Sequence, residues 1–105
     1  MQLQGVTGFE WDRGNRDKCQ KHGVSLSEIE FAFHGTMKFF PDIVHSVHEI
    51  RYIAVGDTRE GRKLFVCFTL RKRAGETYIR PVSARYMHQK EVESYEEAIT
   101  NPQDR

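Results

Sequence analysis

The sequence contains only two cysteines and no long apolar run. Cys19 and Cys67 lie far apart in a chain of 105 residues, and Cys67 falls within an apolar, strand-like pattern. A disulfide-rich framework is therefore excluded, and both side chains are expected to be reduced thiols. The chain has no stretch of about 18 apolar residues that would span a bilayer. Residues 1–5 lack the charged and apolar regions of a signal peptide, so the sequence predicts a cytoplasmic protein.

The sequence also lacks a full set of metal ligands. His45 and His48 are three residues apart, which places them on opposite faces of the strand expected there. Cys19 and His22 offer at most two ligands on a helix, whereas a structural zinc site needs four. No metal and no other cofactor is therefore predicted. No repeat, linker or low-complexity tract interrupts the chain, so one domain is expected over residues 1–105.

Charge is distributed unevenly, although the net charge is only +1. Residues 1–50 hold 5 Lys/Arg and 7 Asp/Glu, residues 51–90 hold 10 and 3, and residues 91–105 hold 1 and 5, which gives −2, +7 and −4. The basic middle is typical of a protein that binds a polyanion such as RNA or DNA. The acidic end indicates a separate solvated or protein-binding face. The alternative is that the basic residues only solvate a surface.

Two helices are predicted in the first third of the chain. Residues 1–8 show no periodicity and are expected to be a frayed start, and residues 9–12 predict a short extended segment. Asp12 is the expected N-cap of a short helix over residues 13–22, which Gly23 ends. Ser25 and Glu28 have the spacing of a capping box, and an apolar face continues to about residue 33.

The middle of the chain predicts strands. Residues 37–40 are an extended connection or a strand, and three strands are expected at about 47–55, 63–70 and 77–82. Their short connections favour an antiparallel meander. A last helix is predicted over about residues 86–99, followed by a tail over residues 100–105. The expected fold is α+β, with three or four antiparallel strands packed with N-terminal helices and a C-terminal helix.

The boundary between the third strand and the last helix, residues 79–87, is a candidate anion site. Arg80 and Arg85 flank this boundary, and Ser83 is at the expected N-cap position. A helix N-terminus carries unpaired N–H groups and partial positive charge, so two arginines beside it favour a bound phosphate. The alternative is a final strand followed by a docked terminal helix.

A second candidate site lies on the first meander strand. Side chains two residues apart on a strand point the same way, so His45, Glu49 and Arg51 are expected to share one face. They would supply a general acid or base, a carboxylate that orients it, and a cation for developing negative charge. These groups would cleave a phosphodiester without a metal. The alternative is charge pairing on a solvated sheet face.

Further basic residues lie on the neighbouring segments. Arg71 is expected on the same strand face as residues 65, 67 and 69, because side chains two residues apart point the same way. This places Arg71 at the edge of a packed face. Lys72 and Arg73 enter a hairpin turn, where they bind RNA or only protect the sheet from edge pairing. Arg62 is expected to support Arg51, to bind phosphate, or to form a surface salt bridge.

Six short motifs occur in order along the chain. They are Phe9-Glu10-Trp11-Asp12, Lys21-His22-Gly23-Val24-Ser25, His45-Ser46-x-x-Glu49-x-Arg51, Gly61-Arg62-x-Leu64, Thr69-x-Arg71 and Ile79-Arg80-x-Val82-Ser83-Ala84-Arg85. With this ordered set the chain resembles the BrnT family, the ribonuclease toxins of type II toxin–antitoxin modules, over about residues 9–98.

The resemblance implies a small RelE-like domain that cleaves RNA and thereby inhibits translation and growth. A BrnA-type antitoxin would neutralise it, and the complex would bind operator DNA through the antitoxin; a homodimer within that complex is left open. The implied catalytic residues are His45, Glu49, Arg51, Arg71 and Arg85, and the implied RNA-binding residues are Arg62, Lys72, Arg73, Arg80 and Ser83. Arginine stays protonated in proteins, so the arginines are assigned to charge stabilisation and binding.

Two positions depart from the family pattern. Family members usually have a lysine near position 15 and an asparagine near position 19, where this chain has Asn15 and Cys19. These departures are the basis of an alternative function, a catalytically inactive module that only binds a partner protein or nucleic acid.

Overall fold

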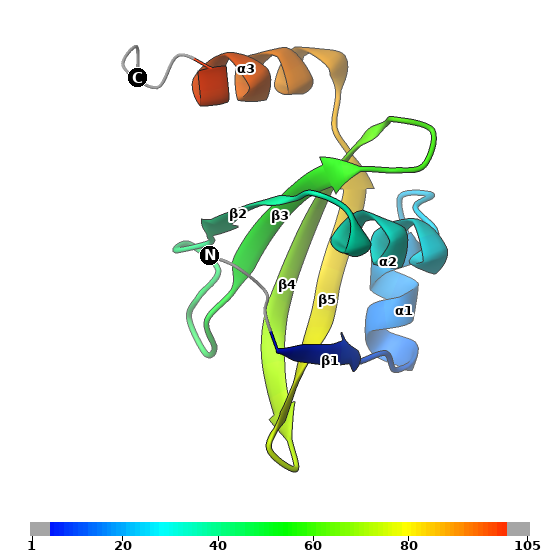
Figure 1. Cartoon of the computed structure of the whole chain (residues 1–105), viewed down its shortest axis with the longest axis vertical. Coiled ribbons are helices and arrows are strands. Elements are labelled where there is room, and N and C mark those ends of the chain that lie inside the picture. Colours follow the sequence, from blue (N-terminus) through cyan, green and yellow to red (C-terminus); the bar gives the residue numbers. More distant parts are fainter. Residues whose placement is uncertain (1–4, 101–105) are drawn as a thin grey trace.

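The computed structural model describes residues 5–100. That part of the chain contains three helices and five strands, arranged as an α+β fold (Figure 1). In chain order they are β1 (Val6–Phe9), α1 (Arg13–Gln20), α2 (Leu26–His34), β2 (Lys38–Pro41), β3 (Tyr52–Asp57), β4 (Lys63–Arg73), β5 (Glu76–Tyr86) and α3 (Gln89–Thr100). The predicted α+β class is confirmed.

The five strands form one mixed sheet with the order β1-β5-β4-β3-β2. Strands β2 to β5 are antiparallel neighbours, whereas β1 pairs with β5 in parallel. The prediction of three or four purely antiparallel strands was therefore wrong. The expected frayed start was also wrong from Val6 onward, because Val6 pairs with Thr77 and the amide of Glu10 donates to the Ile79 carbonyl at 2.8 Å. Residues 1–4 and 101–105 of the predicted start and tail lie outside the described part.

Both N-terminal helices begin at the caps that the sequence predicted. The Asp12 carboxylate accepts from the Asn15 amide at 3.1 Å, and the Asn15 side chain accepts from the Asp12 amide at 2.7 Å. Ser25 and Glu28 form the predicted capping box at the start of α2. Each box satisfies backbone N–H groups that a helix start leaves unpaired. Gly35 is the C-cap of α2.

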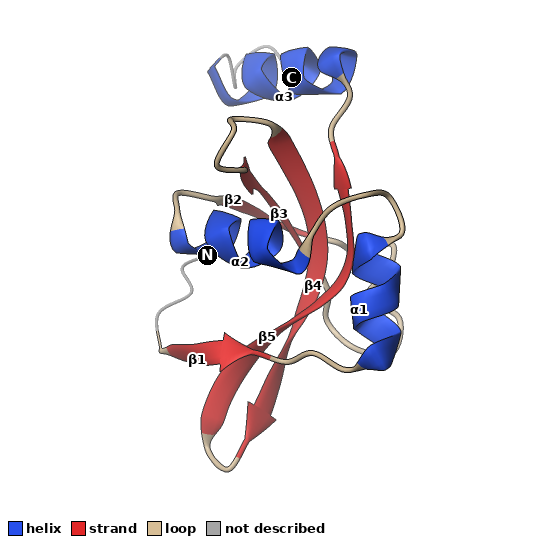
Figure 2. Cartoon of the chain, turned by 90° about the vertical axis from the view of Figure 1, so that its right-hand side faces the viewer, coloured by secondary structure: helices blue, strands red, loops and turns tan. Residues whose placement is uncertain are grey.

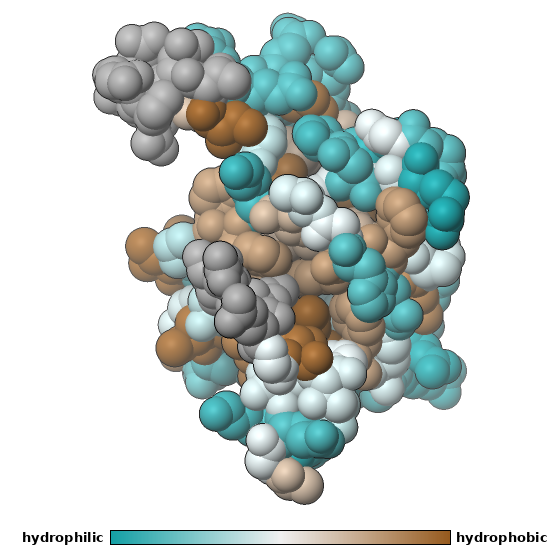
Figure 3. Space-filling view, viewed as in Figure 1, coloured by the Kyte–Doolittle hydropathy of each residue, from teal (hydrophilic) through white to brown (hydrophobic). Residues whose placement is uncertain are grey.

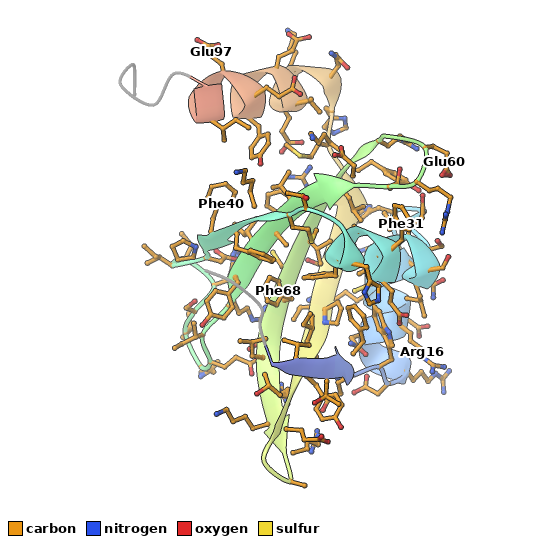
Figure 4. All side chains as sticks on the ribbon, viewed as in Figure 1. Arg16, Phe31, Phe40, Glu60, Phe68 and Glu97 are labelled. Atoms are coloured by element: carbon orange, nitrogen blue, oxygen red, sulfur yellow. The ribbon has the colours of Figure 1, made fainter. Side chains whose placement is uncertain are left out.

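The core lies between α2 and one face of the sheet. Phe68 of β4 is fully buried, and Figure 4 shows it in the middle of the sheet. The Phe68 ring contacts Phe33 at 5.3 Å, Tyr52 at 5.4 Å and Phe39 at 5.9 Å between ring centroids. Such edge-to-face and tilted contacts add to the free energy of burying apolar area. Helix α1 instead lies alongside β5 (Figures 1 and 2).

Strand β5 is longer than predicted and removes the expected helix N-cap. The strand continues to Tyr86, so Ser83 lies inside it and pairs with Cys67 instead of capping a helix. The last helix begins only at Gln89. Pairing along the long β4 strand buries Ala84 and outweighs the local helical pattern of these residues. The predicted anion site at a helix N-terminus beside Ser83 was therefore wrong.

The first meander strand is shorter than predicted. β3 begins at Tyr52, and residues 42–51 form a loop between β2 and β3. Ser46 stabilises this loop because its hydroxyl donates to the Asp42 carbonyl at 2.6 Å and accepts from the Arg51 amide at 2.9 Å. His45, Glu49 and Arg51 therefore do not share one face of a strand. Residues 38–41 form a strand, one of the two predicted options.

Helix α3 lies beyond one end of the sheet (Figures 1 and 2). It follows β5 after Met87 and His88. Across residues 5–100, no helix is long and apolar enough to cross a membrane.

Candidate functional site

The sheet face opposite α2 carries a row of polar and basic side chains. Cross-strand partners project from the same face of a sheet. Four such pairs of β4 and β5 lie on this face: Phe65 with Arg85, Cys67 with Ser83, Thr69 with Arg80, and Arg71 with Tyr78. We call this surface the open face.

A β-bulge places Arg80 and Arg85 on the same face. Cys67 pairs with Ser83 and Phe68 pairs with Pro81, so Val82 is an extra residue on β5. In an unbroken strand, residues five apart point to opposite faces, and the inserted residue reverses that alternation. The bulge follows Pro81, which lacks an N–H group for a regular ladder. Both arginines consequently reach the open face.

The 42–51 loop packs onto the open face through polar contacts. The Thr69 hydroxyl donates to the Ile50 carbonyl at 2.8 Å, and the Asp42 amide donates to the Arg51 carbonyl at 3.0 Å. Asp42 is only 7% exposed. These contacts hold Glu49 and Arg51 beside β4. The aliphatic side chains of the loop point outward, and brown atoms project at this edge in the space-filling view (Figure 3): Ile43, Val44, Val47 and Ile50 are 65–81% exposed.

Helix α1 closes the other side of the open face, and Asn15 fixes its position. Asn15 is 4% exposed, and its Nδ2 donates to the carbonyls of Glu10 at 2.9 Å and Pro81 at 2.8 Å. One side chain therefore connects the start of α1 to the bulged part of β5. Gly14 and Lys18 are four residues apart on α1, so they lie on one face of that helix.

A cavity of about 260 Å³ lies between α1, the 42–51 loop and the two long strands. It is lined by Gly14, Asn15, Lys18, Glu49, Arg51, Arg71, Arg80 and Val82. Four of these side chains carry positive charge and one carries negative charge. Such a concentration of cations in a concave site favours a phosphate group.

Glu49 lies between two of these cations. Its Oε2 is 3.1 Å from Nη2 of Arg71, and its Oε1 is 3.8 Å from Nη2 of Arg51. About a third of the Glu49 side chain is exposed. The Nε atoms of Arg51 and Arg71 are buried without a hydrogen-bond partner in the described structure. The two guanidinium groups thus keep donor capacity that Glu49 does not use.

Arg80 is fixed by carboxylates at the start of α1. Its Nη1 is 2.8 Å from Asp12 and 3.3 Å from Glu10. The hydrogen bond that Arg80 donates to the Asp12 carboxylate raises the pKa of Arg80 above its usual range. Arg73 also binds Glu10, at 2.6 Å, and that hydrogen bond lowers the pKa of the Glu10 carboxyl. Arg80 is therefore held rigidly as a cation at the cavity wall.

The model of one protein family matches residues 11–91, which is most of the chain. This family is described as the ribonuclease toxin, BrnT, of type II toxin–antitoxin systems. The chain belongs to the BrnT family. A search of curated proteins finds no match. The matched range contains every residue that lines the cavity, and membership of a type II family implies an antitoxin partner.

The BrnT chain brings together three of its five predicted catalytic residues. Glu49, Arg51 and Arg71 line the cavity. His45 does not line it; its Nδ1 is 3.0 Å from both carboxylate oxygens of Asp42, and its side chain is about two-thirds exposed. Arg85 lies farther along the open face, where it binds Glu91.

The predicted RNA-binding residues are more widely spread. Arg80 lines the cavity, and Ser83 lies on the open face opposite Cys67. Lys72 and Arg73 are exposed at the end of β4, next to the hairpin turn, as predicted. Arg62 lies elsewhere, with its guanidinium carbon 3.5 Å from the centre of the Tyr86 ring. It supports neither Arg51 nor the cavity.

Sequence reasoning missed the contribution of α1 to the cavity. Lys18 supplies a cation to this wall, and the spacing of Gly14 and Lys18 was the available signal. Asn15 and Cys19, the two departures from the family pattern, are both buried, and burial raises the pKa of the Cys19 thiol to about 11. These two positions therefore support the fold, and both cysteines of the chain are free.

Two other cavities lack this concentration of charge. One of about 280 Å³ lies at the start of α2 and contains Arg59 beside Glu28 and Glu60. Another of about 170 Å³ lies beside β1 and contains apolar and neutral side chains with His34. Neither gathers several cations around one carboxylate.

Proposed function

We propose that this BrnT protein is an endoribonuclease whose reacting centre is the cavity between α1, β4, β5 and the 42–51 loop. The observation that carries the proposal is the position of Glu49 between Arg51 and Arg71, in a cavity that Lys18 and Arg80 also line. A carboxylate accepts a proton, and the surrounding cations stabilise the negative charge that develops on a phosphate.

In the proposed reaction the RNA 2′-hydroxyl attacks the adjacent phosphorus. Glu49 takes the proton of the 2′-hydroxyl, the bond from the 2′-oxygen to phosphorus forms, and the bond to the 5′-oxygen breaks. Arg51, Arg71 and Arg80 stabilise the phosphorane, and Lys18 gives its proton to the leaving 5′-oxygen. Lysine is assigned this step because arginine does not release its proton in proteins. The products are a 2′,3′-cyclic phosphate and a 5′-hydroxyl.

We propose that the reaction is independent of metal ions. Four cationic side chains and a single carboxylate line the cavity, and this charge disfavours a divalent cation. Within residues 5–100, no three His, Cys, Asp or Glu side chains gather into a metal site. The arginines supply the charge stabilisation that a metal ion would otherwise provide.

Further basic and polar residues on either side of the cavity extend the proposed RNA path. Lys72 and Arg73 lie at the hairpin end of β4, and Ser83 and Arg85 lie toward the opposite end of β5. A single strand that crosses the cavity would meet cations on both sides. His45 is outside the proposed reacting centre because it hydrogen-bonds to Asp42.

We also propose that a BrnA-type antitoxin neutralises the toxin, and that operator DNA is bound only through that complex. The exposed aliphatic side chains of the 42–51 loop support a protein partner, because clustered apolar groups on a surface mark interaction sites. The same loop carries Glu49 and Arg51 to the cavity. A partner on this loop would therefore cover the mouth of the site.

Cleavage of a labelled RNA by purified protein tests the proposal. E49Q keeps the shape of the side chain and removes the base, so the rate should fall by about 100- to 10,000-fold. E60Q makes the same change outside the cavity and should cleave normally. The wild type should remain active in a metal chelator and leave 2′,3′-cyclic phosphate ends. Equal rates for E49Q and E60Q would refute the assigned site, and a chelator that abolishes cleavage would refute the metal-free reaction.

A further inference from the structure

Arg85 and Phe65 form a distinct basic feature on the open face. The guanidinium carbon of Arg85 lies 4.4 Å from the centre of the Phe65 ring, and the two residues are cross-strand partners. Thr69, the partner of Arg80, is four residues from Phe65, which corresponds to about 14 Å along the strand. Arg85 is therefore separate from the cavity but on the same surface.

In the free protein, Arg85 forms an ion pair with the Glu91 carboxylate. Both oxygens of Glu91 accept from the guanidinium, with distances of 2.8 Å to Nη1 and 2.8 Å to Nη2. This two-pronged geometry is also how arginine binds a phosphate group. Arg85, together with the His88 amide, lowers the pKa of the Glu91 carboxyl to about 2. Glu91 is thus an anion wherever RNA is stable.

Helix α3, which carries Glu91, has few contacts with the sheet. The Met87 amide donates to the Lys63 carbonyl at 2.9 Å, and one aromatic contact joins Tyr95 to Phe40 at 6.2 Å between ring centroids. Figure 4 shows Phe40 near α3 and Glu97 on the side of the helix away from the sheet. The ion pair of Glu91 with Arg85 is accordingly a main attachment of this acidic helix.

We propose that Arg85 and Phe65 form a second phosphate subsite for the RNA strand, and that Glu91 occupies this subsite in the free protein. RNA then binds by exchange: a backbone phosphate replaces the Glu91 carboxylate on Arg85. The acidic helix acts as a built-in competitor for the toxin's own substrate. This inference rests on the proposed RNA-directed function and adds a second subsite to it.

The inference predicts how the Glu91 charge affects the affinity for RNA. RNA must break the ion pair between Glu91 and Arg85 before it binds Arg85, which weakens its binding. Removal of the Glu91 charge should therefore strengthen RNA binding. The gain should require Arg85, because Glu91 acts through that guanidinium. A general decrease of negative charge would instead strengthen binding by the same factor whether or not Arg85 is present.

Fluorescence anisotropy with a fluorescein-labelled 2′-O-methyl RNA tests this prediction, because that RNA binds but lacks the attacking 2′-hydroxyl. E91Q should bind several-fold more tightly than wild type. E93Q removes the same charge from the same helix, where Glu93 accepts from the Gln89 side chain instead of an arginine, and should bind like wild type. R85A should bind more weakly than wild type, and E91Q should give no gain in the R85A background. Equal affinities for E91Q and E93Q, or a gain that persists in R85A, would overturn the inference.

Cleavage of unmodified RNA is measured separately on the same variants. If the protein cleaves RNA but E91Q does not strengthen RNA binding, the subsite would be refuted and the proposed reacting centre would stand. A clear E91Q effect in a protein that does not cleave RNA would support the subsite and refute the ribonuclease proposal. Absence of RNA binding in every folded variant would refute the subsite.

Discussion

Asn15 shows how one side chain can determine the geometry of a site without taking part in its chemistry. Its amide group accepts from the Asp12 amide and donates to the carbonyls of Glu10 and Pro81. It therefore caps α1 and also joins that helix to the bulged strand. Polar groups buried in this way contribute most through the cost of leaving their partners unpaired. The position of Lys18, one turn later on α1, depends on the same contacts.

We expect N15A to reduce the free energy of unfolding by about 2–4 kcal/mol, because three hydrogen bonds are lost and buried carbonyls stay unpaired. Urea unfolding followed by circular dichroism measures this change. Q20A alters an exposed side-chain amide on the same helix, which donates to the Arg16 carbonyl at 3.2 Å, and should cost less than about 0.5 kcal/mol. Similar losses for N15A and Q20A would show that Asn15 is not the link between α1 and β5.

At the scale of elements, the 42–51 loop and the β5 bulge build the site together. The loop carries Glu49 and Arg51 to β4, and the bulge turns Arg80 toward the same side. Sequence reasoning placed the loop residues on a strand because the alternation of residues 47–55 resembles one. In the structure, hydrogen bonds join Ser46 to Asp42 and to Arg51, at the two ends of the loop. These bonds hold residues 42–51 in a loop, so the strand begins only at β3.

We expect S46A to impair cleavage although Ser46 does not line the cavity. Loss of its hydroxyl removes the bond to the Asp42 carbonyl and leaves the Arg51 amide without this acceptor, at a cost of about 1 kcal/mol in stability. Glu49 and Arg51 would then be held less precisely in position, so the cleavage rate should fall at least about tenfold. S94A, on an exposed part of α3, is the matched control. An unchanged cleavage rate in folded S46A protein would exclude this role of the loop.

At the scale of the whole molecule, the chain separates its charges onto different surfaces. Arg51, Arg71 and Arg80 of the basic middle segment line the cavity, and Arg85 lies on the open face. The acidic end of the chain forms much of α3. The uneven charge of the sequence predicted a basic surface for a polyanion, and the cavity gives that surface a defined place. One acidic residue, Glu91, folds back onto the basic face.

RNA binding should depend strongly on salt because cations of this face neutralise phosphates. A strand that contacts three or four phosphates should give a slope of about −2 to −3 for log K against log salt, at about −0.7 per phosphate. Anisotropy titrations over a series of KCl concentrations measure the slope. R71A should reduce the magnitude of the slope by about 0.7, which corresponds to the loss of one phosphate contact. R59A, whose guanidinium lies over the Phe31 ring outside the open face, should not change it. A slope near zero for the wild type would contradict electrostatic binding of RNA.

The sequence by itself determined the features that depend on residues close together in the chain. The caps at Asp12 and Ser25 follow from side chains within one helical turn, and the structure confirms them. The α+β class and the hairpin before residue 76 follow from local patterns in the same way. The ordered motifs also indicated the BrnT family, which the family match bears out.

Only the tertiary structure decided which basic residues meet. Pairing with β4 extends β5 past Ser83, so the expected helix does not start there. The extra residue at Val82 places Arg80 and Arg85 on one face of the sheet. The contact of Lys18 with the same cavity as Glu49 joins positions far apart in sequence. Local propensity differs by about 1 kcal/mol between residue types, so cross-strand pairing and burial outweigh it. A single inserted residue moves every following side chain of a strand to the opposite face. The position of such an insertion depends on how the strand pairs with distant parts of the chain.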